Sequence, residues 1–249
     1  MKEVFSKTYT GDKNAIRTFI KTYATAGTNF DERKRNSLKL FELEEQTINI
    51  KSFKKPNLLN SIIYRFFRPS KAQRSFEYAH KLLESGIGTP TPIAFFEERT
   101  RMGFKRSYYV SEHLDYDLTY RELVHDSVYV GDKNILQDFG AFTYKLHENE
   151  IQFLDHSVGN TLITLKNKKP SFYLVDLNRM KFGKMNFKTR MKNFERLSKI
   201  DSHIRYMAEG YTQNSGEDVE TVYTAMRHYI QKYQTKFYRK KRWKKFFGL

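Results

Sequence analysis

The stretch of sequence that decides the fold is Gln152-Phe-Leu-Asp-His-Ser-Val-Gly-Asn-Thr-Leu-Ile163, a polar patch between apolar ends. An apolar segment that reads as a strand follows it, Ser171-Phe-Tyr-Leu-Val-Asp-Leu-Asn-Arg179. Asp155 and Asn160 are separated by four residues, the catalytic-loop spacing in which an Asp orients an acceptor hydroxyl and an Asn binds magnesium. Asp176 ends the following strand, where a second magnesium carboxylate belongs. The three residues therefore predict a site for phosphoryl transfer.

Each of these residues also has a plainer interpretation. Asp155 and Asn160 can cap a turn, and Asp176 can form an Asx turn at a strand end. One such residue alone favours that interpretation, whereas the joint order and spacing of all three favour the site. Magnesium fits the set, because it prefers oxygen ligands and keeps several waters, so that one amide and one carboxylate suffice beside substrate phosphates.

The composition bounds what the chain can be. With 249 residues, 39% of them apolar, it is long enough for one sizeable domain or two small lobes. The absence of cysteine excludes disulfides and thiolate chemistry. The net charge of +17 implies an anionic partner, which can be nucleic acid, anionic lipid or a phosphorylated substrate. No export signal and no membrane-spanning run is evident, so we expect a cytoplasmic protein.

The hydrophobic pattern predicts an α+β chain. The expected elements are a helix over 14–23, a β-hairpin over 37–43 and 47–53, a helix over 71–85 that ends at Gly86, strands over 93–97 and 108–113, and helical segments over 120–124 and 135–148. This order predicts two lobes, a small β-rich N-lobe over residues 1–113 and a mainly helical C-lobe over residues 114–249.

A kinase also needs a cation on the nucleotide phosphates. Lys51, on the second hairpin strand, lies where such a lysine belongs, and Glu77 on the next helix is positioned to hold it. Lys54 and Lys55 are competing lysines, and Glu84 is a rival partner near the helix end. Taken singly, Lys51 and Glu77 also suit a solvated strand and an exposed helix face.

The remaining nucleotide contacts are expected at a hinge and a turn. Backbone groups near Glu112 and His113, in Tyr108-Tyr-Val-Ser-Glu-His-Leu114, can bond the adenine edge, although the segment also reads as a buried strand with polar residues at its end. No G-x-G-x-x-G loop is present. The turn over residues 33–36 would then cover the phosphates, with Arg35 contributing charge.

Across residues 35–196 the chain resembles the bacterial lipopolysaccharide kinases, the Kdo and heptose kinases, which have a protein-kinase-like fold. The segments that carry the resemblance are Ile50-Lys-Ser-Phe53, Glu84-Ser-Gly-Ile-Gly-Thr-Pro-Thr-Pro-Ile93, Tyr109-Val-Ser-Glu-His113, Asp155-His-Ser-Val-Gly-Asn160 and Val175-Asp-Leu-Asn-Arg179. The resemblance implies ATP-dependent phosphorylation of a sugar hydroxyl, such as that of Kdo, in the inner core of lipopolysaccharide at the cytoplasmic face of the inner membrane.

The resemblance also assigns roles to individual residues. Lys51 would bind the phosphates, Asp155 would be the base, and Asn160 with Asp176 would bind the metal. The chain departs from the pattern at two places. Phe153 stands where related kinases usually have a His, and Leu177-Asn178 replaces the Phe-Gly of a protein-kinase metal motif. Neither change removes a metal ligand, so activity is expected, with a pseudokinase as the alternative.

The C-terminal end is basic and aromatic. No acidic residue follows Glu220, and eight cations lie from Lys232 onward. Such a segment can lie in a bilayer interface with Trp243, Phe246 and Phe247 at headgroup depth, so we expect it to bind an anionic membrane. The alternatives are a solvated end, a helix that packs Tyr229, Tyr233 and Phe237 on the domain, and an RNA-binding segment, for which no nucleic-acid motif is present.

Overall fold

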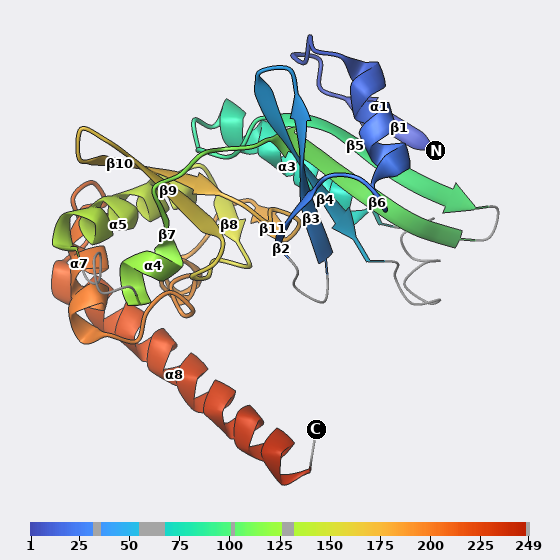
Figure 1. Ribbon diagram of the computed structural model, residues 1–249. Helices are drawn as coiled ribbons and strands as arrows, with labels where there is room; N and C mark the ends of the chain where they lie inside the picture. Colours follow the sequence, from blue (N-terminus) through green and yellow to red (C-terminus); the bar gives the residue numbers. More distant parts are fainter. Residues whose placement is uncertain (32–35, 55–67, 101–102, 126–131, 248–249) are drawn as a thin grey trace. The chain divides into compact units, whose positions relative to one another are not determined.

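The computed structural model describes residues 1–31, 36–54, 68–100, 103–125 and 132–247 (Figure 1). The chain divides into two compact units, Met1–Asp115 and Tyr116–Leu249, close to the predicted boundary after His113. The first unit is built on a sheet and the second is mainly helical. This confirms the predicted α+β class.

The first unit contains a six-stranded sheet in the order β1-β5-β6-β4-β3-β2, with antiparallel pairing throughout. Its strands are β1 (Lys2–Phe5), β2 (Thr28–Asp31), β3 (Asn36–Leu43), β4 (Gln46–Phe53), β5 (Pro92–Thr100) and β6 (Gly103–Glu112). The predicted hairpin is β3 and β4. The hydrophobic pattern misses β1 and β2, because both are short edge strands with mostly exposed side chains.

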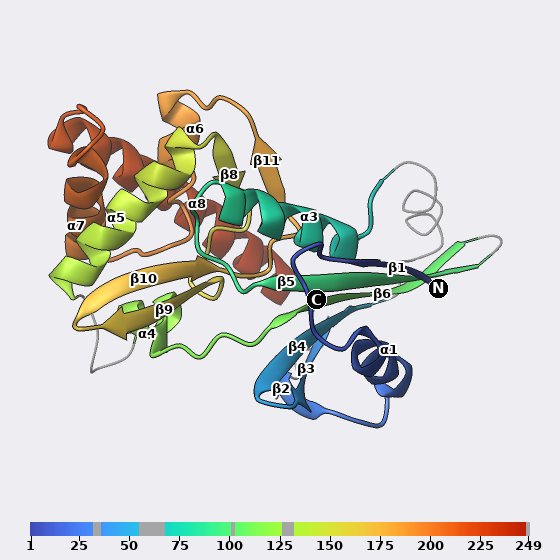
Figure 2. The same cartoon turned by 90° about the horizontal axis from the view of Figure 1, so that it is seen from above.

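Two helices cover opposite faces of this sheet (Figure 2). Helix α1 (Lys13–Thr22) packs Ile16 into a cluster with Ile50, and α3 (Lys71–Glu84) packs Phe76 into a cluster with Phe53. Side chains alternate between the two faces along a strand. Lys51 therefore lies on the face that α3 covers.

The ends of α3 follow from its sequence. Ser70 is the N-cap, and its hydroxyl oxygen accepts a hydrogen bond from the Gln73 amide at 3.0 Å. At the other end Gly86 adopts a φ of 65°, and the amide of Ile87 donates to the carbonyl of Leu82 at 2.8 Å. A glycine tolerates this left-handed conformation without the cost of a Cβ atom. The predicted C-terminal cap at Gly86 is confirmed.

The second unit is a helical core with two small sheets. Its helices are α4 (Tyr120–His125), α5 (Lys133–Glu148), α6 (Phe187–Lys192), α7 (Asp201–Thr212) and α8 (Val219–Phe246). Its strands are β7 (Leu118–Thr119), β8 (Ile151–Phe153), β9 (Thr161–Lys166), β10 (Lys169–Leu174) and β11 (Met180–Phe182), which form the sheets β10-β9-β7 and β11-β8. Phe139 of α5, Met207 of α7 and Met226 of α8 are fully buried in one cluster, so the three helices share a core.

One expectation for this unit needs correction, and another holds in part. The strand expected to run to Arg179 ends at Leu174, so Asp176 lies in the loop before β11. The expected packing of the C-terminal helix holds for its first part, because α8 buries Val222, Met226 and Ile230 and packs Tyr229 against the core. It does not extend to Phe237, which is 52% exposed. Among the described residues, no helix is both long enough and apolar enough to cross a membrane.

Candidate active site

Two short ladders bring the loops of the predicted catalytic site together. Strand β8 pairs with β11, and β9 pairs with β10, so residues 154–160 and 175–179 connect the same two ladders. The loops are also bonded at both ends. The Leu154 amide donates to the Arg179 carbonyl at 3.0 Å, and the Val175 amide donates to the Asn160 carbonyl at 3.0 Å. The topology thereby gathers Asp155, Asn160 and Asp176 on adjacent loops of the second unit.

The Asp155 carboxylate is 19% exposed and is held by two arginines. Arg196 Nη1 lies 2.7 Å from Asp155 Oδ1, and Arg179 Nη1 lies 3.3 Å from Oδ1 and 3.4 Å from Oδ2. Charge-assisted bonds of this kind restrain a carboxylate more than neutral ones do. Asp155 is therefore fixed in direction yet open to solvent, as a group that orients a hydroxyl must be.

Asn160 and Asp176 offer oxygen ligands of the type that magnesium prefers. Asn160 Nδ2 donates to the Asp155 carbonyl at 2.8 Å, which leaves Oδ1 as the end of the amide that can bind a metal. Asp176 adopts a φ of 59°, an uncommon conformation for a residue with a Cβ atom, and its Oδ1 accepts a hydrogen bond from Asn178 Nδ2 at 2.6 Å. Among the described residues no group of three His, Asp or Glu could hold a metal. These two residues fit magnesium only together with substrate phosphates and water.

A buried hydrogen-bond chain supports this loop from behind. Asn193 Nδ2 donates to the Phe153 carbonyl at 2.7 Å, and its Oδ1 lies 3.1 Å from His147 Nε2. His147 Nδ1 lies 3.1 Å from the hydroxyl of Tyr211. Burial lowers the pKa of His147 to about 4, so the ring is neutral at pH 7. Helices α5 and α7 are thus coupled to the backbone two residues before Asp155.

In the first unit, Lys51 and Glu77 lie on neighbouring elements. Lys51 Nζ is 5.7 Å from the centroid of the Phe53 ring, on the face that α3 covers. Glu77 is partly buried on α3 and accepts a hydrogen bond from Gln73 Nε2 at 2.7 Å. The rival Glu84 is exposed at the last residue of α3, and Lys54 is exposed beyond β4. The competing Lys55 and the predicted Arg35 lie outside the described residues.

At the predicted hinge, both amides already serve the sheet. The Glu112 amide donates to the Thr91 carbonyl at 3.0 Å, and the His113 amide donates to the Thr47 carbonyl at 2.8 Å. An adenine ring that needs a backbone donor would therefore have to take it from a residue beyond His113.

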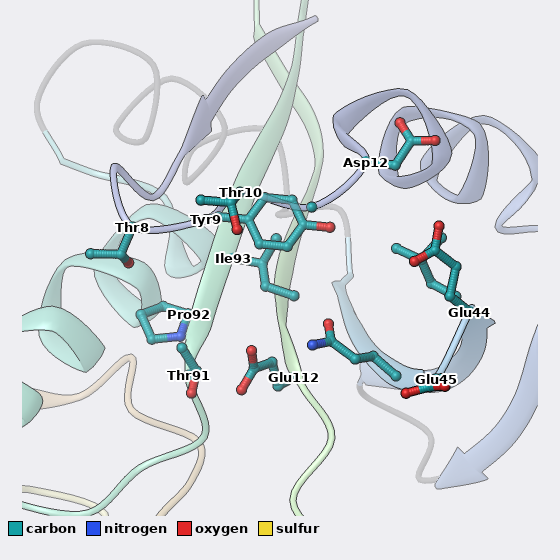
Figure 3. Close-up of a pocket in the computed structure, with 13 residues that line it drawn as sticks. Thr8, Tyr9, Thr10, Asp12, Glu44, Glu45, Thr91, Pro92, Ile93 and Glu112 are labelled. Carbon is teal, nitrogen blue, oxygen red and sulfur yellow. The ribbon is translucent and has the colours of Figure 1, made fainter.

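A pocket of about 460 Å³ lies in the first unit, beside Glu112 (Figure 3). Its walls come from the loop before α1, the turn between β3 and β4, the start of β5 and the end of β6. The acidic residues that line it are Asp12, Glu44, Glu45 and Glu112. Like charges repel, so this pocket is unsuited to the phosphates of a nucleotide.

Arg179 and Arg196 are the residues that the sequence pattern does not identify. Arg179 is only the last residue of a segment that resembles the family, Val175-Asp-Leu-Asn-Arg179. Arg196 is 41 residues from Asp155 in the chain. One feature of the sequence points to them indirectly, namely a missing cation in the loop. The four residues between Asp155 and Asn160 include no Lys or Arg. A phosphoryl-transfer loop without a cation must obtain its positive charge from elsewhere.

Comparison with known proteins identifies the class of this fold. The structure is similar to a solved structure titled "WaaP in complex with acyl carrier protein", with a TM-score of 0.64 and 13% sequence identity over 95% of this chain and 98% of that chain. The fold is therefore protein-kinase-like. The sequence model of the lipopolysaccharide kinase (Kdo/WaaP) family matches residues 31–223. The chain belongs to this family, which confirms the resemblance.

No curated protein matched the chain. Membership in the family makes the protein an ATP-dependent phosphotransferase that acts on a sugar hydroxyl.

Proposed function

We propose that the protein phosphorylates a hydroxyl of Kdo in the inner core of lipopolysaccharide or in a lipid A precursor, and that it uses ATP with magnesium. The observation that carries the proposal is the convergence of Asp155, Asn160 and Asp176 on two loops joined at both ends. Family membership supports the sugar acceptor. The choice of Kdo as the acceptor sugar rests on the resemblance of the sequence segments to the Kdo and heptose kinases.

Asp155 acts on the acceptor. Its carboxylate, held by Arg196, orients the sugar hydroxyl and accepts its proton as the phosphoryl group is transferred in line. Asn160 and Asp176 hold the metal through Oδ1 and the carboxylate, respectively. When bound, magnesium neutralises charge on the phosphate oxygens. The protein thus contributes positioning and charge stabilisation more than covalent chemistry.

Lys51 binds the ATP phosphates, and Glu77 orients it. Two observations support this choice. Lys51 lies on the face of the sheet that α3 covers, since it alternates in phase with Phe53. Glu77 is partly buried, whereas Glu84 is exposed. Glu112 and His113 contact adenine through groups other than their amides, which the sheet already uses. Arg35, which lies outside the described residues, adds positive charge at the phosphates.

The C-terminal part of α8 binds the anionic membrane in which the substrate is anchored, at its cytoplasmic face. With 100° per residue, Trp243, Phe246 and Phe247 fall within about a third of the helix circumference. Their side chains are 63%, 85% and 58% exposed. The rest of the circumference in the last two turns is basic, with Lys240, Lys241, Arg242, Lys244 and Lys245. Aromatic side chains beside basic ones suit a lipid interface. They suit nucleic acid less well here, because the sequence contains no nucleic-acid recognition motif.

The first test is phosphate transfer from ATP to Kdo-lipid A, followed by mass spectrometry. Wild type should add one phosphate, and Asp155→Asn, Asp176→Asn and Lys51→Ala should each lower the rate by on the order of 10²-fold or more. Asp138→Asn, which changes an exposed carboxylate on α5, is the matched control for the two Asp variants. Lys54→Ala is the matched control for Lys51→Ala, and it also tests whether the rival lysine binds the phosphates.

A second measurement separates an inactive relative from a wrong acceptor. A ligand that binds only the folded state raises the unfolding temperature. ATP with magnesium should therefore raise it for wild type and less for Asp176→Asn. A wild-type protein that shows this shift without transfer has another acceptor, such as a protein or a different sugar. Absence of both would identify a pseudokinase and refute the proposed function.

A further inference from the structure

The loop between Asp155 and Asn160 lacks a cation of its own. It consists of His156, Ser157, Val158 and Gly159. His156 is fully buried, and burial lowers its pKa to about 3, so the ring carries no charge at pH 7. Phosphoryl transfer spreads negative charge over three oxygens close to the acceptor hydroxyl. Positive charge in the second unit must then come from outside this loop.

The guanidinium groups of Arg179 and Arg196 lie beside Asp155 and can supply this charge. Arg179 ends the loop that contains Asp176, and Arg196 follows α6, so separate segments direct them to one carboxylate. Two arginines on one Asp leave an excess of one positive charge. Each contact to Asp155 uses Nη1, and the Nε–Nη2 edge, the edge suited to bidentate binding of a phosphate or carboxylate, remains outside this ion pair.

The two arginines differ in how firmly they are held. Arg196 Nη1 lies 2.7 Å from Asp155 and its side chain is 34% exposed, whereas the Arg179 contacts are 3.3 and 3.4 Å and its side chain is 56% exposed. Bonds of that length are weak. Arg179 can therefore exchange Asp155 for a ligand at little cost, while Arg196 keeps the carboxylate in place.

We propose that Arg179, supported by Arg196, forms an oxyanion-binding site beside Asp155. The ligand is a group of anionic oxygens at the point of transfer, either the transferred phosphoryl group or the carboxylate of a sugar-acid acceptor. This inference rests on the proposed function. In the reaction the bond from the acceptor oxygen to phosphorus forms while the bond from phosphorus to the β,γ-bridging oxygen breaks. The hydroxyl proton passes to Asp155, ADP leaves, and neither arginine exchanges a proton.

Binding of simple anions tests the site without turnover. Isothermal titration would measure the affinity of inorganic pyrophosphate and of free Kdo for wild type, Arg179→Gln and Arg227→Gln. Arg227 is the matched control, because its side chain is 50% exposed and pairs at 2.9 Å with Asp201, not with Asp155. At least one anion should bind Arg179→Gln about 10-fold more weakly, with Arg227→Gln like wild type. Equal affinity in both variants, or no binding to wild type, overturns the proposal.

Kinetics identify the source of the oxyanion. If it is the transferred phosphoryl group, Arg179→Gln lowers kcat on the order of 10²-fold with little change in the KM for the acceptor. If it is the acceptor carboxylate, the KM for Kdo-lipid A rises about 10-fold, and an acceptor with that carboxyl group reduced shows no difference between variant and wild type. Arg179→Lys should recover part of either loss, because it keeps the charge but not the fork.

The two possible failures are distinct. Wild type that transfers no phosphate contradicts the proposed function, and the titrations still decide whether an anion site exists at Arg179. Transfer by wild type with kcat and KM unchanged in Arg179→Gln overturns the inference and leaves the kinase proposal intact. Arg196→Gln is a secondary variant, because its partly buried side chain also restrains Asp155.

Discussion

His156 follows the proposed catalytic Asp but points into the core. Its ring lies 5.4 Å from that of Phe139 and 5.8 Å from that of Phe153, measured between centroids. Among the described residues neither ring nitrogen has a hydrogen-bond partner. Such a group stays neutral when folded, whereas the unfolded chain protonates it near its ordinary pKa of 6.5. The residue therefore links the stability of the second unit to pH.

The sign of this linkage is that of a lowered histidine pKa. The contribution of His156 to the free energy of unfolding is fully present above about pH 6.5. It is lost as the pH falls, because the unfolded state binds the proton first. His156→Leu should reduce the dependence of the free energy of unfolding on pH by up to about 1.4 kcal/mol per pH unit between pH 6.5 and 4. Urea unfolding at several pH values measures it. An unchanged slope, equal to that of the exposed control His228→Leu, would contradict the prediction.

Asn193 couples the core to the proposed catalytic loop. Asn193→Ala removes the donor to the Phe153 carbonyl and the partner of His147 Nε2. Leaving such buried groups unpaired costs about 1–3 kcal/mol each. We expect a loss of stability of this order in urea unfolding. We also expect a fall in kcat, measured where the variant is still folded, because the backbone before Asp155 loses its support. Wild-type kcat in a destabilised but folded variant would show that Asn193 supports only the fold.

At the scale of elements, α5 and α7 pack unusually closely. A Cβ atom on Gly210 would lie 1.7 Å from the carbonyl oxygen of Gln137, and one on Gly140 would lie 2.1 Å from that of Met207. Real Cβ atoms do not approach backbone this closely, so the two glycines allow the helices to touch.

Gly210→Ala should therefore destabilise the second unit, although alanine favours a helix by about 1 kcal/mol. The clash is with backbone and cannot be relieved by a rotamer change, so we expect a net loss of about 1–3 kcal/mol in urea unfolding. Asp138→Ala, at an exposed site of α5, should be neutral or slightly stabilising. A stable Gly210→Ala protein would show that the helices can separate at no cost.

The local pattern of the sequence predicts the β3–β4 hairpin and α3, but not the bounds of α7 or α8. The β3–β4 hairpin alternates clearly, and α3 carries both an N-cap and a glycine C-cap, so local pattern and caps suffice for them. Strands β8 and β11 have three residues each, too short for any periodicity to register. They exist because each pairs with the other across the chain.

The candidate site shows the same division between local and distant information. Asp155, Asn160 and Asp176 are visible through local spacing, and the ladders bring them together. Arg196 reaches Asp155 through a fold that places the segment after α6 against the loop, which no local pattern encodes. The conformation of Asp176 is likewise set by the β10–β11 connection, which the sequence pattern reads as continuing strand.

At the scale of the whole molecule, the excess charge is carried in part by a helix end that contributes nothing to the core. Val222, Met226 and Ile230 are the buried residues of α8, and every side chain from Thr235 to Phe247 is exposed. Six of the cations lie at residues 239–245. A chain that bears such a segment should bind anionic surfaces without changing its fold.

Neutralising Lys240, Lys241 and Lys244 to Gln should weaken binding to vesicles that contain anionic lipid by on the order of 10²-fold, since each cation near the surface contributes about 1 kcal/mol. The matched control neutralises the same number of lysines at the β9–β10 turn: Lys166, Lys168 and Lys169. Co-sedimentation at increasing salt measures both variants, and binding of wild type should fall as salt screens the charges. The unfolding temperature should stay unchanged, because these side chains are exposed. Equal losses in the two triple variants would mean that net charge alone, and not α8, attracts the membrane.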